Sequence, residues 1–351
     1  MQNTVTINRL SVPKRFEDTL LDQVSLMSQS ELLEVLYDGK SPILSAPPEG
    51  FTYIKIQKEK KNTVKRGRIG YFGPHPSDLP DFIGGITSQL HNASMNEFLL
   101  TEGELGASPL SEDETRRIRR QEAIGGSIIL ENIIKVLSKE NGIVLPDGDV
   151  LSHMDEATQL VKQTIQHEEL SIIIAPGPEA DHPDHVATFL AVMQALCQLG
   201  QEGYFIDKEI PAVYLTDPEY GYGSGGSWAK EKIEAIVHDY PYLKQMEAFV
   251  TPDYIVDISA GMQKATAALL MHATQMEGKE YLWKIPMLKR VRGLQIGVAW
   301  AEGLRQVIFP GVSSNENKLA EYLPEKSMFI LSPKNYFTNP NTDPLRTKSA
   351  N

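Results

Sequence analysis

The sequence predicts a doubly wound α/β fold, with a mostly parallel sheet and helices on both of its faces. Two observations lead to this prediction. Short apolar runs alternate with longer helical runs from about residue 68 to residue 276, and no internal repeat recurs at a fixed period. Such alternation is typical of strand–helix units that repeat around a parallel sheet.

The expected elements follow one another in this order along the chain. Short apolar runs predict strands near 68–73, 96–103, 143–148, 170–177, 210–217 and 253–259. The longer runs between and after them predict helices near 83–93, 112–138, 154–166, 185–199 and 262–276. No linker rich in Pro or Ser divides this region, so we expect one catalytic domain at 67–310. Residues 1–66 form an N-terminal extension or cap, and residues 311–351 a C-terminal extension.

Composition excludes several classes of protein. The chain has 351 residues, with 34 Lys and Arg against 46 Asp and Glu, for a formal net charge of -12. The chain therefore lacks a basic surface that could bind nucleic acid.

No run approaches the ~18 to 20 apolar residues of a membrane span, and no secretory leader is visible, so we expect a cytoplasmic protein. With Cys197 alone, any metal must be held by His, Asp and Glu.

Two loops, each following a predicted strand, carry the candidate chemistry. The first runs from Gly73 to Asp78, and the second from Pro178 to His185. Ligand sites of open α/β sheets form at the carboxyl ends of strands, so the two loops are expected to face one crevice. His75 and Asp78, together with His185 or His182, would supply two imidazoles and a carboxylate to a divalent metal.

A metal with an open coordination position predicts hydrolysis of an amide or ester, because it activates a bound water. The same ligand set occurs around Fe(II) in oxygenases, but we would expect an all-β barrel there. The run 221–226 matches G-x-G-x-x-G only formally, since Asp217 to Tyr220 separate it from the preceding strand. We interpret it as a loop over the pocket, where Tyr220 and Trp228 could bind substrate by stacking.

The sequence resembles the LmbE-like, or PIG-L, family of zinc-dependent N-deacetylases. The resemblance covers about 68–305 and rests on six motifs that occur in the family's order: PHPSDLPDFIGG at 74–85, Thr-Glu-Gly-Glu at 101–104, Arg-Arg-Gln-Glu-Ala at 119–123, Leu-Pro-Asp-Gly at 145–148, His-Pro-Asp-His at 182–185 and PDYIVDIS at 252–259. A final helix at 292–304 also resembles the family. The resemblance implies a Rossmann-like fold.

The resemblance also implies roles for individual residues. It places the ligands of one Zn²⁺ per chain on His75, Asp78 and His185, with Fe²⁺ or another divalent metal as the alternative. It makes His182 the residue that stabilises the oxyanion and Asp184 the carboxylate that orients His182. Two further residues, Glu104 and Arg120, would shape the substrate pocket.

One position departs from the family's pattern. Ser77 stands where the family has the Asp that serves as general base, and a serine hydroxyl cannot do that work at neutral pH. We expect a zinc-dependent deacetylase acting on an N-acetylated amino sugar of the GlcNAc type, a small-molecule substrate. The alternatives are a catalytically impaired homologue that binds metal and sugar, or an amidase with another N-acyl substrate. The sequence does not indicate the oligomeric state.

Overall fold

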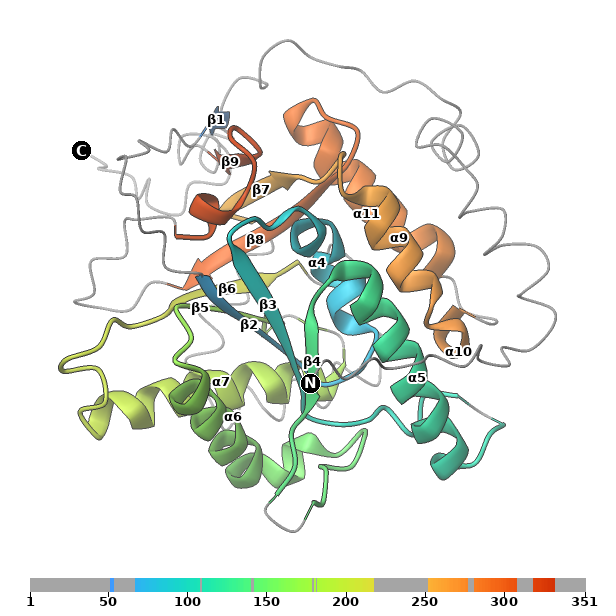
Figure 1. Cartoon of the computed structure of the whole chain (residues 1–351), viewed down its shortest axis with the longest axis vertical. Coiled ribbons are helices and arrows are strands. Elements are labelled where there is room, and N and C mark those ends of the chain that lie inside the picture. The colour runs from blue at the N-terminus through green and yellow to red at the C-terminus, as the bar shows by residue number, and fades with distance from the viewer. Residues whose placement is uncertain are drawn as a thin grey trace, which may run out of the picture.

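A computed structural model gives the fold of the chain (Figure 1). It describes residues 51–53, 67–107, 109–139, 142–178, 180, 182–217, 252–276, 281–307 and 318–331. A single nine-stranded sheet runs through these residues in the order β1-β9-β7-β8-β6-β5-β2-β3-β4. The strands are β1 (Phe51–Tyr53), β2 (Gly67–Gly73), β3 (Ala93–Leu99), β4 (Ile133–Val136), β5 (Ile172–Ala175), β6 (Ala212–Thr216), β7 (Tyr254–Asp257), β8 (Ala301–Val307) and β9 (Met328–Leu331).

The half of the sheet from β4 to β6 is parallel throughout. β2 pairs with β3 on one side and with β5 on the other, and β4 and β6 extend the sheet outward from them. The chain lays down β2, β3 and β4 in one direction and then crosses back to β5. This reversal between β2 and β5 creates the switch point at which open α/β sheets bind ligands.

The other half has antiparallel neighbours. β8 pairs antiparallel with both β6 and β7, and β9 pairs antiparallel with β7 and β1. The predicted α/β class is therefore confirmed, and its parallel character is concentrated between β4 and β6. Strand β9 lies in the C-terminal 311–351 segment, so this segment contributes directly to the sheet.

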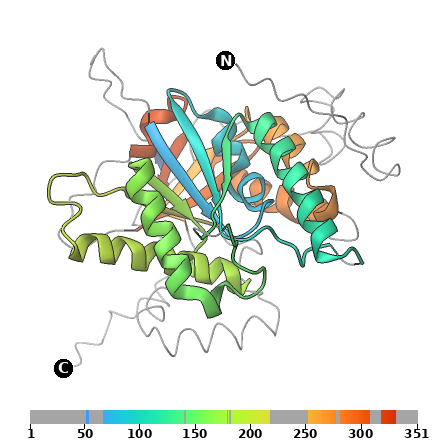
Figure 2. The ribbon, with the colours of Figure 1, turned by 60° about the horizontal axis from the view of Figure 1, so that its bottom comes forward.

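Helices cover both faces of the sheet (Figures 1 and 2). Helices α6 (Met154–Glu168) and α7 (Pro183–Gln201) pack against each other on one face. On the other face lie α4 (Asp78–Gln89), α5 (Glu112–Leu130) and α9 (Met262–Leu270), which contact one another. The short helix α10 (Ala273–Met276) and α11 (Tyr281–Ile296) follow, and η2 (Val150–His153) and η4 (Lys318–Tyr322) are 3₁₀ turns.

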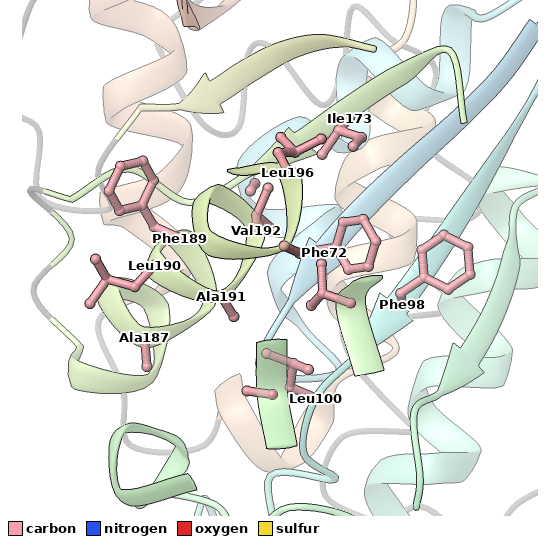
Figure 3. Packing of buried hydrophobic residues seen from close by; sticks show 14 of the residues in the cluster. Phe72, Phe98, Leu100, Ile173, Ala187, Phe189, Leu190, Ala191, Val192 and Leu196 are labelled. Atoms are coloured by element: carbon pink, nitrogen blue, oxygen red, sulfur yellow. The ribbon is translucent and has the colours of Figure 1, made fainter. Parts of the chain in front are cut away.

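Each face of the sheet has its own apolar core. Phe72 and Phe98 stack with ring centroids 5.1 Å apart, and they face the apolar residues of α7 (Figure 3). Ile69 and Tyr71, which alternate with Phe72 along β2, belong to the core under α4 and α9. The two cores hold the central strands between helix layers, so the loops at the strand ends have a rigid support.

The strand predicted at 143–148 is wrong, because these residues form a loop and β4 lies earlier, at Ile133–Val136. Two of the predicted helical runs each divide into a helix and a strand. The run 112–138 divides into α5 and β4, because Glu131 adopts a left-handed conformation (φ 58°) and the β-branched residues that follow pair with β3. The run 292–304 divides into the end of α11 and the start of β8. Gly297 (φ 75°) ends that helix in the left-handed region, where glycine is favoured.

Within the residues that the structure describes, no helix is long and apolar enough to cross a bilayer.

A buried histidine makes the stability of this fold depend on pH. His272, which is 1% exposed, has its pKa lowered to about 3 by burial and then by the charge of Arg119. In the unfolded chain His272 takes up a proton at its ordinary pKa near 6.5, whereas in the folded chain it does so only at a pKa of about 3. The stability that the neutral, buried His272 contributes is therefore complete above pH 6.5 and is lost as the pH falls toward 3.

Between pH 6.5 and pH 4.5, the free energy of unfolding of wild type is expected to fall by about 2 kcal/mol more than that of His272→Gln. Urea denaturation at the two pH values measures the difference. His167→Gln is the matched control, since the His167 side chain is 84% exposed. Equal losses in wild type and His272→Gln would contradict the prediction.

Candidate metal centre

Two loops meet at the carboxyl ends of β2 and β5, as the sequence predicted. The loop after β2 carries His75 and leads into α4, whose first residue is Asp78. The loop after β5 leads into α7, where His182 is the N-cap and His185 lies in the first turn. Because β2 and β5 are neighbours, their loops face each other across the switch point.

His75, Asp78 and His185 form a buried cluster. One ligand atom of each lies within 4.8 Å of the corresponding atoms of the other two. The Asp78 carboxylate lies between the imidazoles, with Oδ2 3.5 Å from His75 Nδ1 and Oδ1 3.3 Å from His185 Nε2. Oδ2 also accepts a hydrogen bond of 2.7 Å from the His75 backbone N–H, which fixes the turn between the two residues.

His185 has the properties of a metal ligand. The residue is 4% exposed, its Nε2 lies 3.3 Å from Asp78 Oδ1, and its Nδ1 has no hydrogen-bond partner among the residues that the structure describes. Buried polar atoms normally have hydrogen-bond partners, and a buried polar atom without a partner destabilises the fold. The ring of Phe82 holds His185 edge-on, with centroids 5.4 Å apart. A divalent metal would satisfy the nitrogen that faces Asp78, so the residues present fit the expected ion.

The electrostatics of the cluster agree with this interpretation. Burial would raise the pKa of Asp78, but His185 and His75 hold it well below its ordinary value. Burial would lower the pKa of His75, but Asp78, Asp147 and Asp184 raise it well above its ordinary value. Asp78 is thus kept ionised, the form in which a carboxylate binds a metal.

Asp147 is a member of this centre that the sequence analysis did not assign, although it lies in the Leu-Pro-Asp-Gly motif. Its Oδ1 lies 3.0 Å from His75 Nε2, and its Oδ2 accepts a hydrogen bond from the Leu105 N–H. With Nδ1 of His75 directed toward Asp78, Nε2–H donates to Asp147. Metal-ligating histidines commonly donate their second N–H to a carboxylate, which fixes the tautomer and orientation of the ring.

We expect Asp147→Asn to weaken zinc binding by about 10- to 100-fold, the usual effect of losing such a carboxylate partner. Competition with a chelator of known affinity measures the change. Asp149→Asn, a little further along the chain, is the matched control because its side chain is 56% exposed. The assignment would be wrong if both variants bound zinc with the wild-type affinity.

The predicted pair His182 and Asp184 lies on the other side of His75. Asp184 is fully buried and accepts hydrogen bonds from the Gly148 and Val150 N–H groups, at 2.7 and 3.2 Å. Its Oδ2 lies 3.6 Å from His75 Nε2. His75, His182 and Asp184 also have potential ligand atoms within 4.8 Å of one another, so a second set of metal-ligating groups overlaps the first.

The protonation of His182 follows from its contacts. Burial, then the charges of His75 and His185, lower its pKa to about 3. Its Nδ1 accepts a hydrogen bond of 3.2 Å from the Asp184 N–H. The proton of the neutral ring is therefore on Nε2. These contacts favour a neutral ring that donates a hydrogen bond through Nε2.

Ser77 lies against a buried guanidinium. Its Oγ accepts a hydrogen bond of 3.3 Å from Arg119, whose other terminal nitrogen donates to the Gly103 carbonyl oxygen at 2.7 Å. Gly103 (φ 67°) wraps closely around Arg119, so that an added Cβ would lie 2.0 Å from the guanidinium. Sequence reasoning did not assign Arg119 a role, and its position in the Arg-Arg-Gln-Glu-Ala motif was the available signal.

The Thr-Glu-Gly-Glu loop supports the first loop and the Leu-Pro-Asp-Gly segment. Thr101 Oγ1 donates to the Pro74 carbonyl oxygen at 2.7 Å, next to His75. Glu104 Oε1 accepts a hydrogen bond of 3.1 Å from the Asp147 N–H. Glu104 therefore contacts the backbone of Asp147, at the edge of the centre.

Other predicted substrate-binding residues are not brought to the cluster. Arg120 pairs with Glu102, and its side chain is 57% exposed. Tyr220 and Trp228 lie outside the described residues. The sequence could not separate Arg119 from Arg120, because only the helical phase of α5 decides which of two adjacent residues faces the loop.

Glu302 of β8 braces α4, which carries Asp78. Helix α4 is kinked at Ile83, and Glu302 accepts hydrogen bonds of 2.9 and 2.8 Å from the N–H groups of Gly85 and Ile86 just beyond the kink. Lys289 pairs with the same buried carboxylate. Glu302 thus caps the second half of α4, leaving the first turn to follow the loop after β2.

The fold and the cluster together define an α/β protein with a candidate metal centre at its switch point. Residues 71–196 match the model of the PIG-L family, which is described as GlcNAc-PI de-N-acetylase. This match contains His75, Asp78 and His185 and confirms the resemblance inferred from the sequence. No curated protein matches the chain significantly.

Solved structures share the fold. N,N'-diacetylchitobiose deacetylase from Pyrococcus horikoshii is 19% identical with a TM-score of 0.51, over 70% of this chain and 87% of that one. GalB, a 4-carboxy-2-hydroxymuconate hydratase from Pseudomonas putida, is 21% identical with a TM-score of 0.50, over 71% and 98% of the chains. A conserved protein from Thermus thermophilus is 20% identical with a TM-score of 0.50, over 70% and 99%.

Proposed function

We propose that this protein is a metal-dependent amide hydrolase that removes the N-acetyl group from an N-acetylated amino sugar. One observation carries the proposal: the buried His75, Asp78 and His185 cluster lies at the switch point, with a nitrogen of each imidazole directed at the Asp78 carboxylate. The family match adds the reaction class, because its description names a GlcNAc-PI de-N-acetylase. Zn²⁺ is the proposed metal, at one ion per chain.

Each residue of the centre has a role in this proposal. A divalent metal held by His75, Asp78 and His185 would lower the pKa of a bound water to about 7 and polarise the amide carbonyl. Asp147 orients His75 through Nε2. His182 presents Nε2–H as a preorganised donor toward the oxygen that becomes negative as the amide is attacked. Asp184 holds His182 at the start of α7 and anchors the segment after Gly148.

The contacts of Ser77 support a second candidate, a homologue that binds metal and sugar with little turnover. A serine bound to Arg119 cannot serve as general base. Among other carboxylates near the two loops, Asp184 is engaged by two backbone N–H groups, and Asp81 lines a separate cavity with Glu302 and Lys289. Asp181 lies outside the described residues.

Acetate release from a panel of N-acetylated amino sugars and their conjugates tests the proposal, with the zinc content of each preparation determined. We expect slow, zinc-dependent release from at least one GlcNAc-type substrate. Release only from other N-acyl compounds would support the amidase alternative. A zinc-loaded protein that binds the sugars and hydrolyses none of them would support the second candidate and refute deacetylation.

A further inference from the structure

The outer face of helix α5 and the neighbouring edge strand β4 form an exposed apolar surface (Figure 1). Ile124 and Ile128 lie one helical turn apart on α5 and are 46% and 52% exposed, and Ile133 at the start of β4 is 50% exposed. β4 ends the nine-stranded sheet, and β3 is its only partner among the strands that the structure describes. We call these three isoleucines and the outer edge of β4 the α5–β4 surface.

The outer edge of β4 is suited to pair with another strand. An unpaired edge presents a row of backbone N–H and C=O groups, and folded proteins normally cover such an edge or protect it with charge. Three of the four residues of β4 are Ile or Val. The fourth, Lys135, places its Nζ over the Phe98 ring and pairs with Glu168 at 2.6 Å, so its charge is engaged within the chain.

The end segments of the chain leave the fold far from this surface. β1 and β9, the described strands nearest to the two termini, lie together at the opposite edge of the sheet. Seven or eight strand spacings of about 4.8 Å separate them from β4, which is roughly 35 to 40 Å. This distance favours an occupant that comes from another molecule.

Charge along α5 makes its outer face complementary to itself. Exposed Arg117 and Arg120 precede the two isoleucines, and exposed Glu131 follows them at the end of the helix. When two copies of α5 pack antiparallel, Ile124 of each copy meets Ile128 of the other. Arg120 of each copy then lies opposite Glu131 of the other, so opposite charges meet at both ends of the apolar contact.

We propose that a second copy of this chain binds the α5–β4 surface, with the two α5 helices antiparallel about a two-fold axis between Ile124 and Ile128. Reciprocal contacts of this kind define an isologous dimer interface. Ile124 and Ile134 line one cavity between α5 and β4, so the same axis brings the two β4 edges side by side.

The proposal does not depend on the proposed function. It does concern the helix that supports the metal loop, because Arg119, on the buried side of α5, donates to Ser77. Dimerisation would therefore hold α5 from its outer side while Arg119 contacts the loop from its inner side.

Sedimentation velocity on the full chain tests the interface, and we expect a particle of twice the 39.1 kDa of one chain. Ile124→Lys and Ile128→Glu each place two unpaired charges in the symmetric interface, and each is expected to weaken the dimer by about 100-fold or more. Ile206→Lys is the matched control, because Ile206 is 82% exposed in the turn between α7 and β6. Thermal melting compares the folding of the three variants.

A mixture of the two single variants tests the two-fold axis itself. In a mixed dimer the new lysine of one chain faces the new glutamate of the other, and the unchanged Ile128 and Ile124 face each other at the symmetry-related contact. We expect the mixture to dimerise at concentrations at which each variant alone is monomeric. High salt is expected to weaken this mixed dimer more than the wild-type dimer.

Three results would overturn the proposal. A wild type that stays monomeric at about 100 μM would show that this surface is covered from within the chain or serves a different partner. A dimer that survives both Ile124→Lys and Ile128→Glu would place the interface elsewhere. A mixture that stays monomeric would show that Ile124 does not face Ile128 across a two-fold axis.

Discussion

Asp78→Asn is expected to abolish stoichiometric zinc binding and to reduce amide hydrolysis by about 10³-fold or more. Asp78 is the only carboxylate in the cluster formed with His75 and His185, among the residues that the structure describes, and it contacts both imidazoles. Asn has nearly the same volume, and its side-chain oxygen can still accept the His75 N–H that Asp78 binds at 2.7 Å. The substitution therefore removes the charge and keeps the turn.

Zinc content by atomic spectroscopy and acetate release, measured on the same preparations, check this result. The pKa of Asp78 is held well below its ordinary value by His185 and His75, so the wild-type ligand is ionised throughout the working pH range. Asp113→Asn, in the first turn of α5 with its side chain 95% exposed, is the control. Full zinc occupancy in Asp78→Asn would transfer the metal to the overlapping set of His75, His182 and Asp184.

Ser77→Asp is expected to raise the rate of hydrolysis by about 10²-fold, the lower end of what a general base contributes. The new carboxylate would lie beside Asp78 at the start of α4, where the PIG-L resemblance expects the base. The gain is limited because Arg119 lies 3.3 Å from the present Ser77 Oγ and would make the carboxylate less basic.

Ser77→Asn separates the charge from the shape of the new side chain, and we expect it to leave the rate within a fewfold of wild type. Rates at saturating substrate, with zinc content matched, are the measurement. A wild type already as fast as Ser77→Asp would show that another group takes the proton. A silent wild type that Ser77→Asp activates would identify a deacetylase scaffold that has lost its base.

Much of this protein follows from local sequence. The alternation of apolar runs determines the parallel strands β2, β3, β5 and β6, because a strand buried between helix layers must be apolar. The His-Pro-x-x-Asp and His-Pro-Asp-His loops after β2 and β5 indicate the candidate ligands, since strand ends of a parallel sheet share one edge. The departure at Ser77 is also visible from sequence alone.

Tertiary structure decides the rest, because it depends on contacts between residues far apart in the chain. Asp147 is distant from His75 in sequence, and only the packing of the loop after β4 brings its carboxylate to 3.0 Å from the His75 ring. The phase of α5 selects Arg119 rather than Arg120 for Ser77. The strand identity of β8 depends on its pairing with β6 and β7 rather than on its own short-range pattern.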